Sequence, residues 1–330
     1  MPVVETVRGP VDVGALGQTL MHEHVFVLDP AHVEDHGKGA WWDEEHRVAD
    51  AIVKLRALVA AGVTTIVDPT VWGLGRYIPR IQRVNAEVPE LNIIVATGIY
   101  TYVDVPFHYA HRGPGTVLDI PEPMVDDFVQ DITEGIAGTG VKAAFLKCAV
   151  EHYGLTPGIE RICRAVAQTH LRTGVPISVH TNPSAGSGTA VVDLFAKEGV
   201  DLTKVVLGHS GDSNDLDQLM ALADTGATLG MDRFGLDLYN PTPARVDTIA
   251  SLCARGYADR MVLSHDAACF FDYFGGMWDD LQQVAPNWNY LHIHRDVLPA
   301  LREKGVTDAQ IDQMLVTNPR RHFSPPGKER

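Results

Sequence analysis

Two histidines near the N-terminus stand one residue apart, in the segment MHEHV at residues 21–25. On a β-strand, residues i and i+2 point to the same side, so His22 and His24 would present two imidazoles to one point while Glu23 faces the other way. Two histidines hydrogen-bonded at the end of a strand would have the same spacing. The motif alone therefore leaves open both a metal site and a structural pair.

Three further groups of the metal-ligating kind stand at the ends of short apolar runs. His180 ends PISVH, His209 ends KVVLGH and Asp266 ends RMVLSHD. Imidazoles together with a carboxylate suit zinc, iron, cobalt or manganese. Because these groups, with His22 and His24, exceed what one four-coordinate catalytic metal needs, the sequence predicts two divalent transition-metal ions, with zinc favoured.

A pair of cations about 3.5–4 Å apart needs an anionic ligand between them. The remaining candidate is Lys147, in the run AAFLKC at 143–148. An ammonium cannot ligate a metal, and this side chain could simply extend to solvent from an apolar strand. A desolvated amine near cations has a lowered pKa, however, and its neutral form can react with CO₂ to give a carbamate, which is a bidentate anion. Cys148 should face the other side of the strand and serve in packing.

The segments that carry these residues alternate between strand-like and helical patterns. Longer segments with apolar residues at three- and four-residue spacing predict helices, most clearly at 43–62, 123–138 and 158–174, and Gly62 and Gly174 are placed to end two of them. Short β-branched or apolar runs predict eight strands, at 18–26, 64–68, 92–97, 143–148, 176–180, 204–209, 227–232 and 260–266.

Eight apolar strands that alternate with helices predict an α/β fold, a closed parallel (β/α)₈ TIM barrel with its active site at the C-terminal ends of the strands. We expect residues 1–330 to form a single barrel domain. A short N-terminal extension at 1–15 and a long loop at 267–290, after the eighth strand, would be its additions.

The composition restricts the partners and the location of the protein. The chain has 330 residues, and 42 acidic against 27 basic residues give a formal charge of −15, which argues against nucleic acid or an anionic membrane as the main partner. Its four cysteines are too scattered for a disulfide scaffold and form no CxxC pair. The segment MPVVETVRGP has no basic start and no apolar signal core, so we expect a cytoplasmic protein.

The ligand candidates, in their order along the chain, resemble the phosphotriesterase family of the amidohydrolase superfamily. The resemblance runs from TLMHEHV (19–25) through VHT (179–181), LGHSGD (207–212) and SHD (264–266) to VTNPRRHF (316–323). It implies that His22 and His24 hold the more buried metal and that carboxylated Lys147 bridges the two. It further implies the remaining ligands: His180 and His209 for the exposed metal, and Asp266 for the buried one, where it also touches the water between the metals.

Within that family the sequence resembles the phosphotriesterase-like lactonases. These hydrolyse N-acyl-homoserine lactones and related lactones, an activity that quenches quorum sensing, and show promiscuous organophosphate triesterase activity. Tyr100 in GIYTY stands where such lactonases carry a tyrosine near the metals, and Arg233 in MDRFG stands where specialised phosphotriesterases carry histidine. The segment after Asp266 is similar to the lactonase acyl-chain loop, although Tyr273 stands where some relatives have tryptophan. The resemblance also suggests a homodimer.

The mechanism that we expect assigns Asp266, Tyr100 and Arg233 to catalysis. Asp266 would take a proton from the attacking water and deliver it to the leaving alkoxide. Tyr100 would hydrogen-bond the carbonyl or oxyanion, and Arg233 would steer the loop or the lactone ring, unless either is a packing residue. An aromatic segment would line an acyl channel or form a hydrophobic cap; it contains Phe270, Phe271, Tyr273, Phe274 and Trp278.

Two other functions stay open on the sequence. A dedicated organophosphate or carboxyl-ester hydrolase would use the same metals and would prefer a triester or an ester to a lactone. A barrel that only binds a ligand is the least favoured, since such a role does not require so many metal-ligating groups at one end of the strands.

Overall fold

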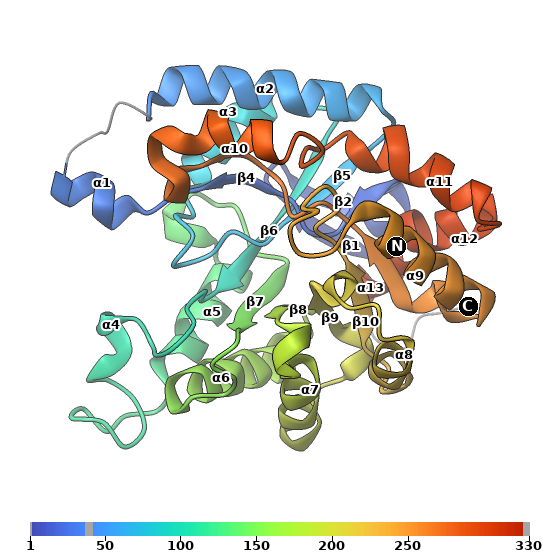
Figure 1. The fold of residues 1–330 in the computed structure, drawn as a ribbon. Helices are drawn as coiled ribbons and strands as arrows, with labels where there is room; N and C mark the ends of the chain where they lie inside the picture. Colours follow the sequence, from blue (N-terminus) through green and yellow to red (C-terminus); the bar gives the residue numbers. More distant parts are fainter. Residues whose placement is uncertain (1, 37–41, 326–330) are drawn as a thin grey trace.

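The computed structural model describes residues 2–36 and 42–325. Within these ranges the predicted barrel is confirmed: eight parallel strands form one sheet, surrounded by helices (Figure 1). In chain order the strands are β3 (Thr19–Leu20), β5 (Thr65–Asp68), β6 (Asn92–Gly98), β7 (Phe145–Val150), β8 (Ile177–Thr181), β9 (Val205–Gly208), β10 (Thr228–Met231) and β11 (Met261–Leu263). All are buried on both faces, which explains their continuous apolar runs.

The first predicted strand, 18–26, is broken into two pieces, and this corrects the sequence interpretation. After β3 the chain leaves the regular ladder, and it resumes as β4 (His24–Val27), which pairs with β12 (Ala268–Phe271). The break results from hydrogen bonds to the chain beyond β11: the Asp266 amide donates to His22 O at 3.1 Å, and the His24 amide donates to Ala267 O at 2.8 Å. These bonds bring the first and the eighth barrel strands together.

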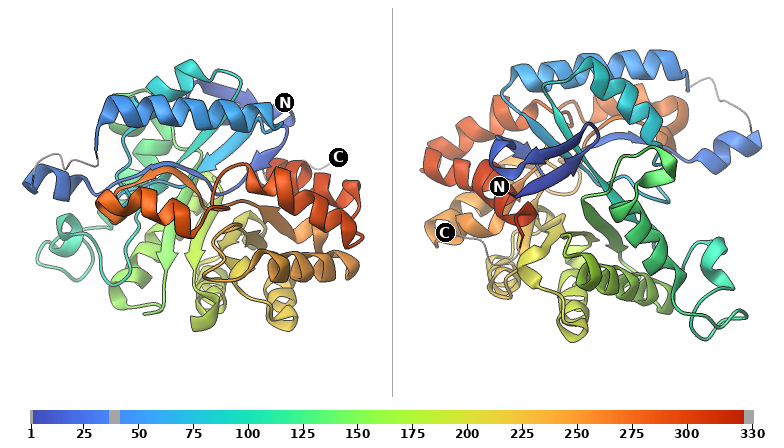
Figure 2. Two further views of the ribbon diagram at one scale, coloured as in Figure 1. Left: turned by 45° about the horizontal axis from the view of Figure 1, so that its top comes forward. Right: turned by 180° about the vertical axis from the view of Figure 1, so that it is seen from behind.

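The helices cover the outside of the barrel, as the paired views in Figure 2 show. Two short π-helical segments, Ile293–Val297 and Gln313–Thr317, lead into α11 and α13. The helices are α1 (Pro30–His36), α2 (Glu44–Ala60), α3 (Ile78–Glu87), α4 (Phe107–Ala110), α5 (Pro123–Thr133), α6 (Pro157–Thr173), α7 (Ser187–Glu198), α8 (Leu216–Asp224), α9 (Thr242–Ala254), α10 (Trp278–Val284), α11 (Leu298–Glu303), α12 (Asp308–Asp312) and α13 (Asn318–Phe323).

Local signals account for most helix boundaries. Asp43 caps α2 by accepting from the His46 amide, and Gly174 ends α6 in the left-handed conformation, with φ +73°. The predicted helix at 123–138 is shorter than expected and ends at Thr133. Its continuation is blocked because Gly135 has φ +120° and residues 136–138 form a separate turn.

The two predicted additions to the barrel both have regular structure. In the N-terminal extension, β1 (Val3–Thr6) and β2 (Gly9–Asp12) form a hairpin, and the amide of Val7, in the turn between them, donates to Ile93 O at the start of β6. The hairpin therefore lies at the N-terminal ends of the strands, on the face turned forward in the right panel of Figure 2. The segment 267–290 contains β12 and α10. No helix in the described ranges combines the length and the apolar character that crossing a membrane requires.

Candidate metal centre and substrate cavity

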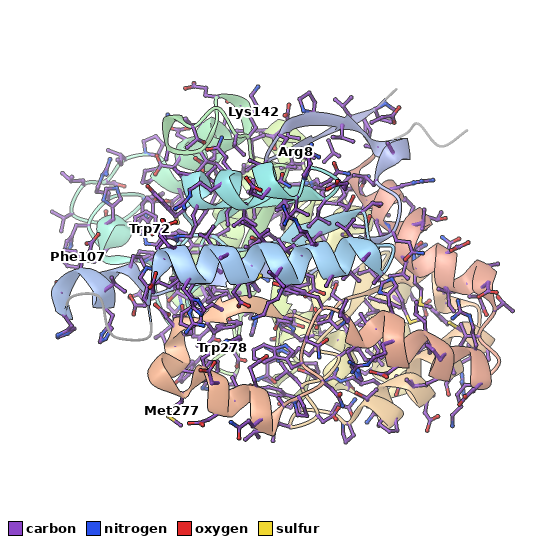
Figure 3. All side chains as sticks on the ribbon, turned by 90° about the horizontal axis from the view of Figure 1, so that it is seen from above. Arg8, Trp72, Phe107, Lys142, Met277 and Trp278 are labelled. Carbon is purple, nitrogen blue, oxygen red and sulfur yellow. The ribbon has the colours of Figure 1, made fainter. Side chains whose placement is uncertain are left out.

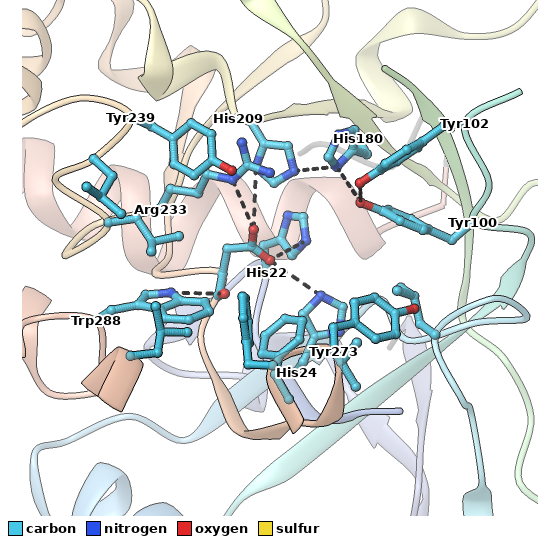
Figure 4. Close-up of a pocket in the computed structure, with 18 residues that line it drawn as sticks. His22, His24, Tyr100, Tyr102, His180, His209, Arg233, Tyr239, Tyr273 and Trp288 are labelled. Atoms are coloured by element: carbon cyan, nitrogen blue, oxygen red, sulfur yellow. Dashed lines mark hydrogen bonds and ion pairs between the residues drawn. The ribbon is translucent and has the colours of Figure 1, made fainter. Parts of the chain in front are cut away.

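A cavity of about 290 Å³ lies at the C-terminal ends of the barrel strands (Figure 4). One side is polar and carries the four histidines of the predicted site together with Asp266; the other side is apolar. The lining residues are His22, His24, Val27, Leu74, Tyr100, Tyr102, His180, His209, Arg233, Leu236, Leu238, Tyr239, Asp266, Phe271, Tyr273, Phe274, Leu281 and Trp288. The strand ends thus bring together all five predicted His and Asp groups.

His22, His24 and Asp266 form a group whose atoms are spaced to hold a metal ion. The Nε2 atoms of His22 and His24 lie 3.3 and 3.4 Å from Asp266 Oδ1. Burial alone would lower the pKa of His24, but Asp266 and Asp68 raise it to about 9. A proton therefore balances these carboxylates in the absence of another cation, and a metal ion in the same place would replace it.

His180 and His209 face each other, with Nδ1 of the first 2.8 Å from Nε2 of the second. The other nitrogen of each ring donates to a carboxylate: His180 Nε2 to Glu151 Oε1 at 3.2 Å, and His209 Nδ1 to Asp232 Oδ1 at 2.8 Å. Burial lowers the pKa of His180 to about 4 and that of His209 well below its ordinary value. Both rings are thus neutral, and with hydrogen on the two nitrogens next to the carboxylates, the lone pairs of the facing nitrogens would meet. A cation would turn that repulsion into attraction, so the residues fit a second metal.

Lys147 lies in the middle of β7 with 1% of its surface exposed. Its Nζ has no hydrogen-bond partner among the described residues, and burial lowers its pKa to about 8. A buried amine without a hydrogen bond is unfavourable, so we expect Nζ to interact with a group other than the protein's own side chains and backbone. Gly98 permits the position: its φ is +137°, and a Cβ there would collide with Lys147 O. The donor set as a whole fits a pair of divalent metals.

Asp232 is a functional residue that the sequence interpretation missed. Its carboxylate accepts from Nδ1 of His22 at 3.1 Å and from Nδ1 of His209 at 2.8 Å. These histidines hold its pKa below the ordinary value, although burial alone would raise it. The three residues are also spaced like metal ligands, but the hydrogen bonds already occupy the facing atoms, so Asp232 orients the two rings from behind. The signal was present, because Asp232 follows β10 directly.

The ring of His24 is also oriented by a hydrogen bond on the side away from the cavity. His24 Nδ1 lies 2.7 Å from Thr70 Oγ1, which donates to Asp68 Oδ1 at 2.5 Å. Glu23 faces away from the cavity, as predicted, and accepts from the backbone amide and Nδ1 of His265. Cys148 also faces away, with its Sγ 4.0 Å from Cys163 Sγ.

Three site residues have a strained backbone. Among the described residues, four that are not glycine have a positive φ, and three of them are His209 (+65°), Arg233 (+61°) and Asp266 (+52°). Each directly follows the end of a barrel strand or lies within three residues of it. The left-handed conformation costs a residue with a side chain roughly 1–2 kcal/mol. Such strain is concentrated at functional sites, and here it turns all three side chains toward the cavity.

Arg233 spans two carboxylates at the polar side of the cavity. Its Nε donates to Asp266 Oδ2 at 3.1 Å and its Nη1 donates to Asp212 Oδ2 at 2.8 Å. Burial alone would lower the pKa of Arg233, but Asp266 and Asp212 raise it, so the side chain is a permanent cation. It can orient a carboxylate but cannot accept a proton from it.

Tyr100 follows β6, and its hydroxyl lies 3.2 Å from His180 Nδ1 and 2.7 Å from the hydroxyl of Tyr102. Burial raises the pKa of Tyr100 well above its ordinary value, so the hydroxyl keeps its proton and can donate it in a hydrogen bond. Figure 4 shows both tyrosines next to His180. Tyr102, which the sequence interpretation did not select, therefore shares this edge of the cavity.

The aromatic segment divides into residues that line the cavity and residues behind it. Phe271, Tyr273 and Phe274 line it, and the Tyr273 hydroxyl donates to Gly73 O at 2.6 Å. Trp278 does not line the cavity, contrary to the sequence interpretation: it is 3% exposed and packs beside helix α2, with Lys54 Nζ 6.0 Å from its ring (Figure 3). Phe270 is likewise in the core. Trp288 lines the cavity instead, and its Nε1 donates to Asp266 O at 3.1 Å.

Comparison with known proteins agrees with this geometry. The model of the phosphotriesterase family matches residues 2–323. A structure described as the phosphotriesterase from Mycobacterium tuberculosis shares 56% identity, covers 98% of each chain and has a TM-score of 0.95. An aryldialkylphosphatase from Saccharolobus solfataricus is 36% identical over 94% of this chain and 95% of its own.

A third similar protein is a solved structure from work described as the molecular engineering of organophosphate hydrolysis activity from a weak promiscuous lactonase template. It is 32% identical, covers 98% of this chain and 100% of its own, and has a TM-score of 0.87. The family match and the barrel with its cluster of metal-ligating groups lead to one conclusion. The chain belongs to the phosphotriesterase family, whose members are metal-dependent hydrolases of ester or phosphoester bonds.

Proposed function

We propose that the protein is a lactonase that hydrolyses N-acyl-homoserine lactones and related lactones, with a secondary activity on organophosphate triesters. The observation that carries the proposal is the division of the cavity. Its polar side, with four imidazoles and Asp266, suits a lactone ring, and its apolar side suits an acyl tail. The apolar residues are Val27, Leu74, Leu236, Leu238, Phe271, Phe274 and Leu281.

The residues that would hold the metals divide into two sets. We assign His22, His24 and Asp266 to the more buried ion, and His180 and His209 to the exposed one. Carboxylated Lys147 would supply the anion between them. Two divalent metals, of which zinc is the first choice and cobalt, iron or manganese are alternatives, would lower the pKa of a shared water and polarise the substrate carbonyl.

Asp266 is placed to move the proton of the reaction. Although burial alone would raise its pKa, His22, His24, His209 and Arg233 hold it well below the ordinary value. The carboxylate is therefore ionised at neutral pH and free to accept a proton from the attacking water. The salt bridge from Arg233 to Oδ2 fixes its orientation. Asp266 would return the proton to the alkoxide, which stays attached to the ring-opened product.

Tyr100 would stabilise the charge that develops on the carbonyl oxygen. Its hydroxyl is protonated, lines the cavity and is oriented by the hydroxyl of Tyr102. A donor held in place before the reaction requires no reorganisation when the oxyanion forms. Arg233 adds a fixed positive charge on the side of the imidazoles opposite to Tyr100.

A dedicated organophosphate triesterase is the second candidate, because two similar proteins bear phosphotriesterase or aryldialkylphosphatase names. The test is kcat/KM of the metal-loaded protein for homoserine lactones with butanoyl to dodecanoyl chains, simple lactones, an aryl carboxyl ester and an aryl dialkyl triester. We expect the best lactone to exceed the triester at least about tenfold, which corresponds to about 1.4 kcal/mol of transition-state stabilisation. A triester or ester that exceeds every lactone would refute the proposal.

A further inference from the structure

Glu151 is an acidic residue beside the metal centre that the proposed mechanism does not use. It is the first residue after β7, four positions beyond Lys147, so the alternation of the strand directs it to the same face as Lys147. The adjacent strand β8 pairs in a register that sets Ala149 opposite His180. Glu151 is outside the lining of the cavity, and its side chain is 15% exposed.

The carboxylate of Glu151 is held at both oxygens. Oε1 accepts from His180 Nε2 at 3.2 Å. Oε2 accepts from Asn182 Nδ2 at 2.9 Å, and from both the backbone amide and Nδ1 of His152, the latter at 2.8 Å. Since Asn182 follows β8 and His152 follows β7, the carboxylate connects the ends of two neighbouring strands. It therefore has a fixed position behind the imidazole of His180.

This position decides which nitrogen of His180 carries hydrogen. With hydrogen on Nε2, the ring donates to Glu151 and turns the Nδ1 lone pair toward His209 Nε2, 2.8 Å away. With hydrogen on Nδ1, the ring would instead donate to His209 Nε2 across the same short distance. That second arrangement is a satisfied hydrogen bond, and it would occupy both nitrogens that a metal needs.

We infer that Glu151 is a positioning residue for the metal centre: it holds His180 in the tautomer that leaves Nδ1 and His209 Nε2 free to bind the exposed metal together. Among the described residues, Glu151 is the carboxylate that reaches His180, since Asp232 orients His22 and His209; the Tyr100 hydroxyl lies on the other side of the ring, 3.2 Å from Nδ1. The inference rests on the metal part of the proposed function and is independent of the lactone substrate.

Two variants of Glu151 test its hydrogen bond to His180. E151A removes the acceptor, whereas E151Q is neutral and has one carbonyl oxygen, for which His180 Nε2 competes with the three donors now at Oε2. One control is matched to them: E122Q alters a carboxylate of similar burial that pairs with Arg161 away from the cavity.

The first measurement is the affinity of the metal-free proteins for Co²⁺, obtained by competition with a coloured chelator, with the visible spectrum of the second bound ion as a check. In E151A we expect the second Co²⁺ to bind about 10–100-fold more weakly, while the first stays within threefold. E151Q should lie between E151A and the wild type. E122Q should remain within threefold of the wild type for both ions.

The second measurement is the tautomer of His180 in the metal-free protein, from long-range ¹⁵N spectra of histidine-labelled samples. We expect hydrogen on Nε2 in the wild type and on Nδ1 in E151A. An unchanged tautomer, or an unchanged affinity for the second Co²⁺, in folded E151A overturns the inference. If E151A does not fold, E151Q decides: because the donors at Oε2 compete for its one carbonyl oxygen, an unchanged tautomer together with an unchanged affinity for the second Co²⁺ overturns the inference. A wild-type protein that binds fewer than two Co²⁺ refutes instead the two-metal part of the proposed function.

Discussion

Lys147 provides a sharp test of the bridging carbamate. Because burial lowers its pKa to about 8 from the ordinary 10.5, the fraction of neutral amine at pH 7 rises roughly 300-fold. Only this neutral form reacts with CO₂. Lys204 is a built-in comparison: it is also buried, but its Nζ donates hydrogen bonds to the carbonyl oxygens of Arg321, His322 and Ser324. We therefore expect one carbamate per chain, at Lys147.

The assay combines ¹³C NMR of protein exposed to ¹³C-labelled bicarbonate with metal analysis and turnover. K147M keeps the apolar stem and fills the space, whereas K147A leaves room for a small acid. Both should lose the carbamate signal, the second metal and at least about 10²-fold in turnover. Propionate should restore part of the activity in K147A and none in K147M. Wild-type protein without label, or K147M with two metals and full turnover, would show that Lys147 is only a packed lysine.

Three further outcomes follow from the described contacts. Asp266→Asn should lower turnover roughly 10²–10⁴-fold with the fold intact, since a neutral amide cannot accept the proton; retained turnover would remove Asp266 from the mechanism. Tyr273→Ala should change the ratio of kcat/KM between dodecanoyl and butanoyl substrates, by up to about fourfold per methylene, without loss of metal. The same ratio in the variant and in the wild type would show that the aromatic segment is a structural cap. Burial, with the positive charges of Lys204 and Arg321, lowers the pKa of His322 to about 3 from 6.5. As the pH falls, His322 is therefore protonated in the unfolded chain before it is protonated in the folded protein. The free energy of unfolding should then fall between pH 6.5 and 3, by up to about 1.4 kcal/mol per pH unit. In urea unfolding at several pH values, His322→Gln should reduce this dependence of stability on pH, whereas His46→Gln, at an exposed position, should not. The same pH dependence in His322→Gln and in the wild type would contradict the reasoning.

The barrel and the rim of histidines could be predicted because both depend on local patterns. Each parallel strand is a short apolar run, and the residue at its end lies at the same edge of the sheet as the others. This rule locates His180, His209 and Asp266 without knowledge of any long-range contact. The same rule applies to Asp232, which directly follows β10.

Other features depend on contacts between distant segments and have no local signal. The first strand breaks because the backbone near His22 bonds to residues beyond β11, more than two hundred positions later. Glu151 acquires its partner only through the register between β7 and β8. The aromatic residues of 268–290 show no period that tells the cavity side from the core side. Helix α10 turns Trp278 inward toward α2, and Trp288 takes a place on the cavity wall.

The hydrogen bonds behind the imidazoles argue against a barrel that only binds an organic ligand. Asp232 and Glu151 lie within hydrogen-bond distance of the rear nitrogens of three rings, an arrangement that favours hydrogen there and leaves a lone pair on each nitrogen that faces the cavity. A ligand pocket built for hydrogen bonds would gain from a mixture of donors and acceptors, and it would not bring His180 Nδ1 to 2.8 Å from His209 Nε2. Converging lone pairs beside an unpartnered amine at Lys147 suit a pair of cations with an anion between them. This unfavourable arrangement of side chains and the strained backbone at the strand ends are therefore best explained if the protein is a metal-dependent hydrolase.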